Sequence, residues 1–359
     1  MKVLAGDTHA LYDPVRTPFE VDERDFPVTA TLEDQFRFLL RYVILAPSTY
    51  NTQPWRFAVS ENGVEVYADY TRRMPVVDPG NRELLLSIGA AVATVRVAAA
   101  HFGFSCLVEY NHTGSSDRPL AIALLTPVAA HPVGDAARAT LFPAVARRRT
   151  NRRAFLLSRI PRSALESFVG LDAGRVSSLT VSVDGRLNET VAALVAEADT
   201  RQLADQAYRD DMSAWVHADT AAVSDGIPAV AIGSTGVSPA IASWAVRAVE
   251  SARQRATQEL NLCRQAPALA VIASEDTVPH WLDAGELLQE LLLTAEREGL
   301  ACSYFNMPMH VPEIRARLRS VIGVSSWPQL LLRIGYCLEE TPRTPRRPLE
   351  DALVPTSIV

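Results

Sequence analysis

Two segments of the sequence carry the residue types that could hold a small polar molecule. The first, residues 46–57, reads APSTYNTQPWRF and lies between a predicted helix and a predicted strand. Its short hydroxyl and amide side chains could line the edge of a heteroaromatic ring that has carbonyl and ring-nitrogen groups. An ordinary helix-ending turn, with Pro54 and Trp55 as a packing anchor, would explain the same composition.

The second segment, residues 147–155, reads RRRTNRRAF and contains five arginines within seven positions. Thr150 or Asn151 could cap a helix end here, and arginines beside free backbone N–H groups form an anion site. A further cluster follows the last predicted strand and comprises Arg343, Arg346 and Arg347. A solvated basic run is the alternative interpretation. A ligand with a phosphate at one end and a polar heteroaromatic ring at the other would fit both segments.

Composition limits the classes of protein to consider. The chain has 359 residues, of which 48% are hydrophobic and 21% charged, as expected for a soluble globular protein of two ordinary domains or one large one. Its formal net charge of −6 argues against a general nucleic-acid binder. Lys2 is the only lysine, which excludes a Schiff-base or P-loop lysine in the body of the chain.

Several motifs and targeting signals are absent from the sequence. It contains no G-x-G-x-x-G, G-x-x-x-x-G-K-[ST], H-E-x-x-H or G-x-S-x-G, and its four cysteines are too scattered to predict a disulfide framework or a zinc site. Residues 226–246 are uncharged but rich in Gly and Pro, which favours a loop leading into a short helix over a membrane span. With no apolar secretory segment near Met1, we expect a cytoplasmic protein without membrane contact.

The elements that would position these segments form a weak internal repeat. Hydrophobic periodicity predicts helices over 31–46, 84–102 and 281–298, and strands within 55–70 and over 106–110, 121–125, 179–183, 269–273 and 330–336. In the two long helices Gly89, Ala99 and Gly103 lie opposite Gly285, Ala295 and Gly299, each pair 196 positions apart. Chance similarity of Ala- and Gly-rich helices is the alternative. Two related halves in one chain would make a fused dimer, which often places its site at the seam.

The two segments resemble signatures of the nitroreductase superfamily. Residues 46–57 are similar to "APSxxNxQPW.F", and residues 148–152 to "RRSxR" with Thr in place of Ser. Residues 285–299 and 330–349 resemble that family's glycine-flanked helix and its C-terminal ending. Each signature occurs once, in the reverse of the ordinary order, which resembles the single-chain, double-length Acg-type FMN-binding subfamily. The resemblance implies an α+β fold in which two homologous halves, residues 28–130 and 140–353, form an intramolecular pseudo-dimer. It also implies a lid at about 205–250 and one interlocked functional unit.

The resemblance also implies a set of FMN-binding residues. Arg148, Thr150 and Arg152 would hold the phosphate and ribityl chain, assisted by Arg346 or Arg347. The flavin would be lined by Pro47, Ser48, Tyr50 and Asn51, and by Asn306 and Met307 in the loop 303–308. No metal ligands are expected. Tyr50 and His310 are candidates for a general acid, each with an ordinary structural role as the alternative, and no catalytic residue is assigned.

The implied activity is that of an FMN-dependent oxidoreductase of the nitroreductase type. Hydride would pass through flavin N5 between a reductant such as NAD(P)H and a small organic substrate: a nitro compound, a quinone or a pathway intermediate. The alternatives are a non-catalytic protein that sequesters FMN beneath a lid and a flavin-dependent biosynthetic dehydrogenase. We expect no nucleic-acid partner, and either a monomer with an internal pseudo-dimer or a weak homo-oligomer.

Overall fold

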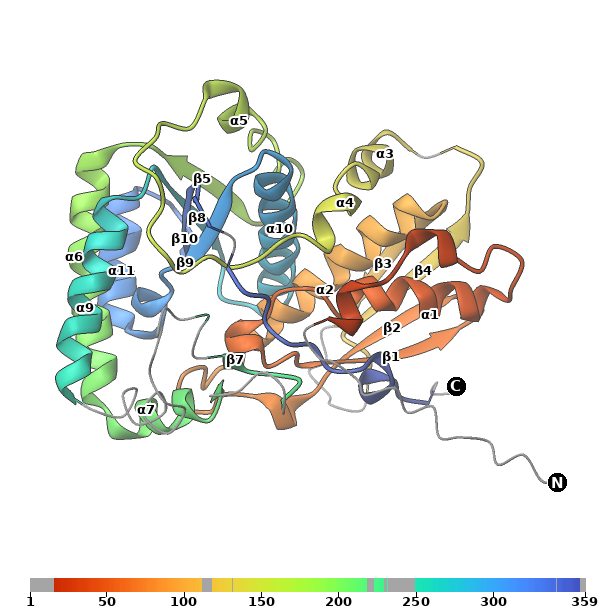
Figure 1. The fold of residues 1–359 in the computed structure, drawn as a ribbon, viewed down its shortest axis with the longest axis horizontal. Helices are drawn as coiled ribbons and strands as arrows, with labels where there is room; N and C mark the ends of the chain where they lie inside the picture. Colours follow the sequence, from red (N-terminus) through yellow and green to blue (C-terminus); the bar gives the residue numbers. More distant parts are fainter. Residues whose placement is uncertain are drawn as a thin grey trace.

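Two four-stranded antiparallel sheets organise the chain (Figure 1). The computed structural model describes residues 16–111, 118–130, 132–217, 223–228, 231, 249–339 and 341–355. The first sheet has the order β1-β2-β4-β3 and is made of β1 (Trp55–Ser60), β2 (Gly63–Ala68), β3 (Phe104–Tyr110) and β4 (Ala121–Pro127). The second has the order β5-β8-β10-β9 and is made of β5 (Ser178–Ser182), β8 (Ala268–Ser274), β9 (Ala301–Tyr304) and β10 (Trp327–Gly335).

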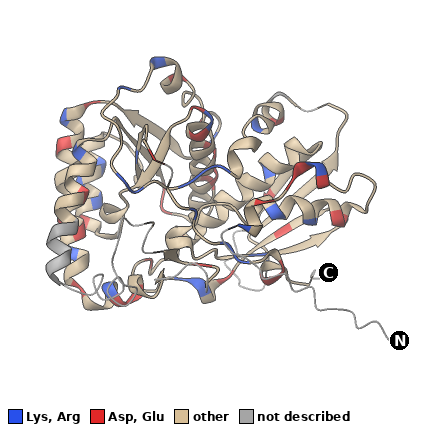
Figure 2. Ribbon diagram, in the orientation of Figure 1, with Lys and Arg blue, Asp and Glu red and all other residues tan. Residues whose placement is uncertain are grey.

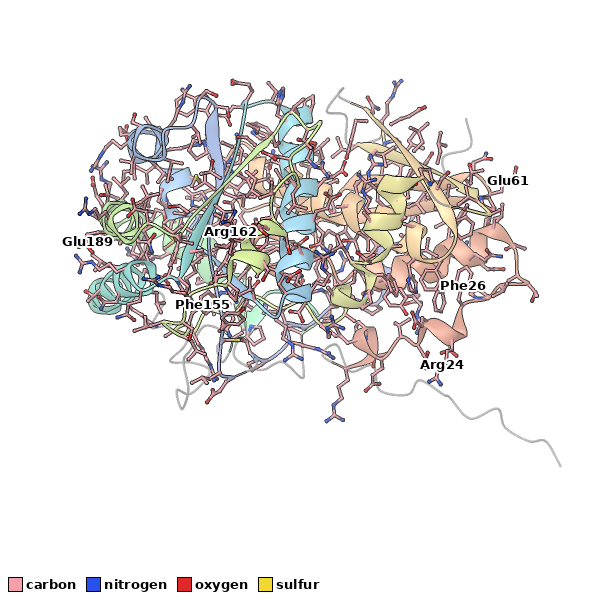
Figure 3. The ribbon with its side chains drawn as sticks, turned by 90° about the horizontal axis from the view of Figure 1, so that it is seen from above. Arg24, Phe26, Glu61, Phe155, Arg162 and Glu189 are labelled. Carbon is pink, nitrogen blue, oxygen red and sulfur yellow. The ribbon has the colours of Figure 1, made fainter. Side chains whose placement is uncertain are left out.

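The two sheets share one topology, because the strands taken in chain order occupy the same places in both. All neighbouring pairs in them are antiparallel. The internal repeat found in the sequence therefore has a counterpart in the fold, and the α+β prediction is confirmed. In Figure 3, Glu61 at the β1–β2 turn and Glu189 on an outer helix mark opposite ends of the molecule. The domain limits drawn from the sequence stay a prediction.

Helices cover the sheets and separate them (Figure 1). The first half contains α1 (Leu32–Val43) and α2 (Arg82–His101), followed by the short α3 (Val133–Ala139) and α4 (Phe142–Val145). The remaining helices are α5 (Arg162–Glu166), α6 (Gly185–Ala204), α7 (Gln206–Ser213), α9 (Val249–Arg264), α10 (Val278–Arg297) and α11 (Pro312–Ile322). Short elements near the seam are β6 (Val216–His217), β7 (Ile227–Pro228) and the 3-10 turn η6 (Met307–His310).

The core is divided among the faces of the sheets. One buried cluster joins α1, α2 and the first sheet, and includes Phe36, Leu40, Phe57 and Ile88. A second joins α10 to one face of the second sheet, while a third packs α6 and α11 against its opposite face. The Gly226–Val246 segment lies largely outside the described residues, so its predicted loop-to-helix structure is described only at 226–228 and 231.

The seam between the halves is the contact between α2 and α10. A Cβ on Gly89 would lie 2.0 Å from the Leu282 carbonyl oxygen, and a Cβ on Gly285 would lie 2.1 Å from the Leu86 oxygen. Leu86 and Leu282 are themselves 196 positions apart, as the two glycines are. Such reciprocal contacts are those of a two-fold dimer interface, here within one chain. The glycines are required because only their bare backbones can approach so closely.

A largely buried ion pair crosses the seam, where Arg96 Nε of α2 binds Glu286 Oε2 of α10 at 2.9 Å. Within the second half, Arg175 holds α10 by binding both Asp283 and Glu290 at 2.9 Å. Among the described helices, only α2 is long and apolar enough to cross a membrane, and 89% of its most apolar stretch is buried inside the fold. It is placed as the core helix of the seam. All four cysteines are free thiols.

Two extended segments cross between the halves. The C-terminal segment returns to the edge of the first sheet, where Val354 N donates to Phe57 O at 2.8 Å. The connection after α4 runs to the edge of the second sheet, where Thr150 forms a parallel bridge with Cys302 of β9. These crossings bring the loop after α1, the arginine segment and the C-terminal segment to one place.

Candidate active site

A pocket at the seam is lined by residues from both halves. Ten of the eleven predicted cofactor residues line it: Pro47, Ser48, Tyr50, Asn51, Arg148, Thr150, Arg152, Asn306, Met307 and Arg346. It holds about 1260 Å³ of empty space, open solvent at its mouth included. Arg347 is not in the lining; its backbone N–H donates to Gln53 Oε1 at 3.0 Å and its Nη2 to Asp351 O at 2.7 Å.

The loop that follows α1 has an unusual backbone. Tyr50, Asn51 and Gln53 have φ values of 47°, 56° and 50°, in the left-handed region that non-glycine residues rarely adopt. Such strain persists where the surrounding structure enforces it, and it is concentrated at functional sites. Here Ser48 Oγ accepts from Gln53 N at 2.9 Å, and Ser87 Oγ on α2 accepts from Thr49 N at 3.2 Å. The sequence signature had not indicated this backbone conformation.

Asn51 joins the loop to two distant segments. Its Nδ2 donates to Gly226 O and to Pro345 O, both at 2.9 Å, and its Oδ1 accepts from Arg346 Nη1 at 2.9 Å. Gln53 Nε2 donates to Ser224 O at 2.9 Å. Residues 223–228, one described stretch of the predicted lid segment, are therefore bound to the same loop that lines the pocket.

Arg346 supports this loop from behind. Its buried guanidinium donates to Leu45 O at 3.1 Å and to Thr344 Oγ1 at 2.7 Å, in addition to Asn51. The guanidinium carbon also lies 5.7 Å from the Phe19 ring centroid. These contacts hold the backbone that precedes the strained residues. The predicted assistance of Arg346 in phosphate binding stays a prediction.

The arginine segment is extended, so the predicted helix cap is wrong. No helix begins at Thr150 or Asn151, because the chain after α4 pairs with the edge of β9, where Asn151 N donates to Cys302 O at 3.0 Å. Arg333 of β10 fixes the segment by donating to Asn151 O at 3.2 Å and Arg153 O at 2.8 Å. Its guanidinium lies 4.1 Å from the centroid of the Phe155 ring, and burial lowers its pKa to about 10.

The five arginines divide by position. Arg147 pairs with Glu296 at 3.4 Å, Arg149 donates to Thr341 O at 3.0 Å, and Arg153 pairs with Glu339. Arg148 and Arg152 instead line the pocket. In Figure 2, blue segments mark this connection where it crosses from α4 towards the second sheet. The sequence could not distinguish the two groups, because the distinction depends on alternation along an extended segment at a sheet edge.

Arg148 has the clearest signature of a ligand-binding residue. Its side chain is buried, and its Nε and Nη1 have no hydrogen-bond partner among the described residues. Burial lowers its pKa, because the charged form loses its hydration. A buried guanidinium without an acceptor is costly, whereas an anionic group would supply the missing acceptors. The site therefore fits a phosphate or another small anion beside Arg148.

At the pocket, His310, a candidate from the sequence, pairs with Glu83, which the sequence analysis did not single out. Glu83, fully buried in the first turn of α2, accepts from His310 Nε2 at 2.7 Å and from Thr49 Oγ1 at 3.0 Å. Burial alone raises the pKa of Glu83, but the charge and hydrogen bond of His310, together with Arg82, bring it to about 2. The two residues are 227 positions apart in the chain, so no local sequence motif could predict their contact.

Replacing Glu83 with glutamine should remove an acid-sensitive part of the protein's stability. A carboxyl whose folded-state pKa lies near 2, below its usual 4.5, contributes stability that is fully present above pH 4.5 and is lost as the pH falls towards 2. We expect wild type to exceed Glu83→Gln by on the order of 3 kcal/mol in free energy of unfolding near neutral pH. Urea denaturation at several pH values measures the difference, which should shrink between pH 4.5 and 2.

Asp78 provides an internal check on that experiment. Burial and the nearby Glu83 charge raise its pKa to about 6, so its own contribution falls as the pH rises through that value, opposite in sign to that of Glu83. Glu83→Gln removes a charge that helps to raise the Asp78 pKa, so the Asp78 contribution differs between the two proteins mainly from pH 3.8 to about 6. The difference between wild type and the variant below pH 3.8 therefore reports on Glu83. A stability difference that does not vary with pH would contradict the assignment.

One wall of the pocket is apolar. Tyr208 and Met212 of α7 contribute to it, with Val216 of β6 and Ile227 of β7. In the part of the chain that the structure describes, no group of three or more His, Cys, Asp or Glu residues could hold a metal ion. The pocket thus combines a cationic end, a strained polar loop and an apolar wall.

Known proteins similar to this chain were found by sequence. The Mycobacterium tuberculosis protein Rv3131, provisionally named an NAD(P)H nitroreductase, is 29% identical over 326 residues, covering 88% of this chain and 90% of that protein. A second protein of that organism, provisionally named NAD(P)H nitroreductase Acg, is 27% identical over 337 residues, covering 90% and 97%. Along most of its length this chain is similar to proteins provisionally named NAD(P)H nitroreductases, Acg among them. The similarity covers about nine tenths of this chain, and no protein-family profile matches it.

Solved structures with partial similarity include an FMN- and NADPH-dependent nitroreductase, NfnB, from a Sphigopyxis strain. It aligns with a TM-score of 0.40 and 20% identity, covering 61% of this chain and 99% of that one. A BluB-like flavoprotein from Clostridium difficile aligns with a TM-score of 0.39 and 13% identity, covering 59% and 96%.

Proposed function

We propose that this relative of the Acg-type proteins is an FMN-dependent oxidoreductase, which moves hydride between NAD(P)H and a small organic substrate. The observation that carries the proposal is Arg148, a buried guanidinium whose Nε and Nη1 lack acceptors at one end of the seam pocket. The names given to the relatives support the reductase activity.

The chemistry of the pocket residues supports FMN as the ligand. Arg148, Thr150 and Arg152 would hold the phosphate and ribityl chain, because the guanidinium groups offer charged donors to an anion. Pro47, Ser48, Tyr50 and Asn51 would line the ring from the first half, and Asn306 and Met307 would line it from the second half. FMN, when bound, supplies two-electron redox chemistry, for which the protein provides binding, orientation and electrostatics.

The chain's own residues would also shape the place for the substrate. Tyr208 and Met212 present an apolar wall, which favours an aromatic or otherwise apolar substrate body and excludes water. Asn51 Nδ2 binds Gly226 O, which holds residues 223–228 against the loop. Breaking this hydrogen bond would control the access of a substrate to the pocket. A nitro compound or a quinone is the substrate class that we propose.

The test is anaerobic mixing of the purified protein with NADPH. A yellow protein with one FMN per chain, whose flavin absorbance bleaches with NADPH and returns on adding a quinone, would support the proposal. A colourless protein that does not take up FMN would contradict it.

A second candidate function is FMN sequestration without turnover. The hydrogen bonds from Asn51 and Gln53 to residues 223–228 favour it, because they would hold the pocket closed. A yellow protein whose flavin is not bleached by NADPH or NADH would support sequestration over reduction. Asn51→Ala, which removes the hydrogen bond from Nδ2 to Gly226 O, should then increase the rate at which FMN leaves the protein.

A further inference from the structure

The His310–Glu83 pair lies in the pocket, yet the proposed FMN contacts do not use it. Glu83 belongs to the first turn of α2 in the first half, whereas His310 ends η6 in the second half. Their side chains meet at 2.7 Å, and both residues line the pocket. The pair therefore exists only where the two halves meet.

The carboxylate determines which nitrogen of His310 faces it with a hydrogen. Glu83 is ionised, since its pKa is about 2, and an ionised carboxylate can only accept hydrogen bonds. His310 must therefore carry a hydrogen on Nε2. In the neutral ring Nδ1 then has a lone pair, which can accept a second proton and pass it to another molecule. That Nδ1 is buried and has no hydrogen-bond partner among the described residues. Buried polar atoms are usually paired, so Nδ1 is the nitrogen available to a bound molecule.

The surroundings of His310 suit a proton donor for an apolar substrate. Its ring centroid lies 6.4 Å from that of Tyr208, which belongs to the apolar wall. Glu83 carries further hydrogen bonds from Thr49 and Arg82, so its position is fixed independently of His310. Imidazole is the side chain best suited to exchange a proton near neutral pH.

We propose that His310 donates a proton from Nδ1 to the substrate, with Glu83 as the residue that positions it. The substrate would have an apolar body and a proton-accepting oxygen, as a quinone or a nitroaromatic compound does. This inference rests on the proposed function, because it assigns a residue to the substrate side of the same pocket.

The proton transfer balances for a quinone. Under the proposed function NAD(P)H is the reductant, and the net transfer of a hydride makes the quinone a hydroquinone monoanion. The Nδ1–H bond of the imidazolium breaks and an O–H bond forms on that anion, giving neutral hydroquinone and neutral imidazole. Solvent returns the proton to Nδ1 before the next turnover.

Steady-state kinetics of His310→Gln with menadione as acceptor test the proposal. Glutamine can still donate a hydrogen bond to Glu83 but cannot supply the proton, so kcat should fall by about 10²- to 10⁴-fold. FMN content and the bleaching of the flavin by NADPH should stay within about twofold of wild type. KM for NADPH should also remain unchanged.

His101→Gln is the matched control. His101 Nε2 also contacts a glutamate, Glu23, at 2.7 Å, but this pair lies at the surface and outside the pocket lining. It should retain wild-type kcat. Equal turnover of His310→Gln and wild type, with normal bleaching, would overturn the His310 assignment alone. Failure of wild type to be bleached would contradict the proposed function instead.

The tautomer of His310 provides a readout that needs neither cofactor nor turnover. In ¹⁵N-histidine spectra of the cofactor-free protein at mildly alkaline pH, His310 should show hydrogen on Nε2 and a lone pair on Nδ1. In Glu83→Gln this preference should weaken, because an amide can either donate or accept. A His310 signal with its hydrogen on Nδ1 in wild type would overturn the proposal.

Discussion

Replacing Arg148 with methionine should abolish FMN binding and at the same time stabilise the protein without cofactor. Arg148 is buried, and its Nε and Nη1 have no partner among the described residues. Its charge therefore destabilises the folded protein unless an anion is bound beside it. Replacing buried ionic groups by apolar side chains of similar size is often neutral or stabilising by about 1–4 kcal/mol. The gain in stability and the loss of binding are thus two consequences of one feature.

The loss of affinity should be large. Hydrogen bonds to charged groups contribute about 1.5–3 kcal/mol each, and two such contacts correspond to a weakening of about a hundredfold or more. FMN fluorescence quenching measures the affinity, and urea denaturation of the cofactor-free protein measures the stability. Adding Arg152→Ala should weaken binding further, since Arg152 lines the same pocket.

Arg147→Met is the matched control for this prediction. Arg147 precedes Arg148 in the chain, but its side chain is 55% exposed and pairs with Glu296 at the surface. It should change FMN affinity by less than about threefold. Wild-type affinity in Arg148→Met would show that the phosphate lies elsewhere, and lower stability of the cofactor-free variant would show that Arg148 has a structural partner.

Replacing Gly89 with alanine should disrupt the seam between the two halves. The added methyl group would lie 2.0 Å from the Leu282 carbonyl oxygen and 3.0 Å from the Gly285 Cα, both of them backbone atoms that cannot rotate away. Overpacking of a core commonly costs about 1–3 kcal/mol, and a backbone clash between two long helices should exceed that range. We expect a loss of more than about 3 kcal/mol in unfolding free energy, with FMN binding lost as the seam opens.

Gly185→Ala is the control for the seam prediction. Gly185 begins α6, and a Cβ there would meet no atom within 4 Å. This change should stabilise the protein slightly, by up to about 1 kcal/mol, because alanine loses less backbone freedom than glycine on folding. Chemical denaturation and FMN titration of both variants test the pair, and a Gly89→Ala protein as stable as wild type would contradict the close approach of α2 and α10.

Helices and strands could be predicted where the hydrophobic periodicity and the flanking turn residues indicated the same element and the same ends. The β1–β2 hairpin around Asn62, the helices α2 and α10, and the strand β10 all fall within a few residues of their predicted ranges. The prediction omitted α6, α9 and α11, which pack on the outer side of the second sheet. Local sequence gave α6 only a weak apolar stripe, and its burial depends on the sheet face that it covers.

The sequence by itself determined the residue types at both ends of the pocket and the repeat that brings them together. Ten of the eleven named cofactor residues line one pocket. Most of them lie in short sequence motifs, whose residue types can be recognised without knowledge of the fold. Tertiary structure decided the rest. It placed Arg148 in the pocket and Arg147 at the surface, turned Arg346 towards the backbone before the strained loop, and joined His310 to Glu83. These outcomes depend on burial and on contacts between residues far apart in the chain, which spacing along a sequence does not encode.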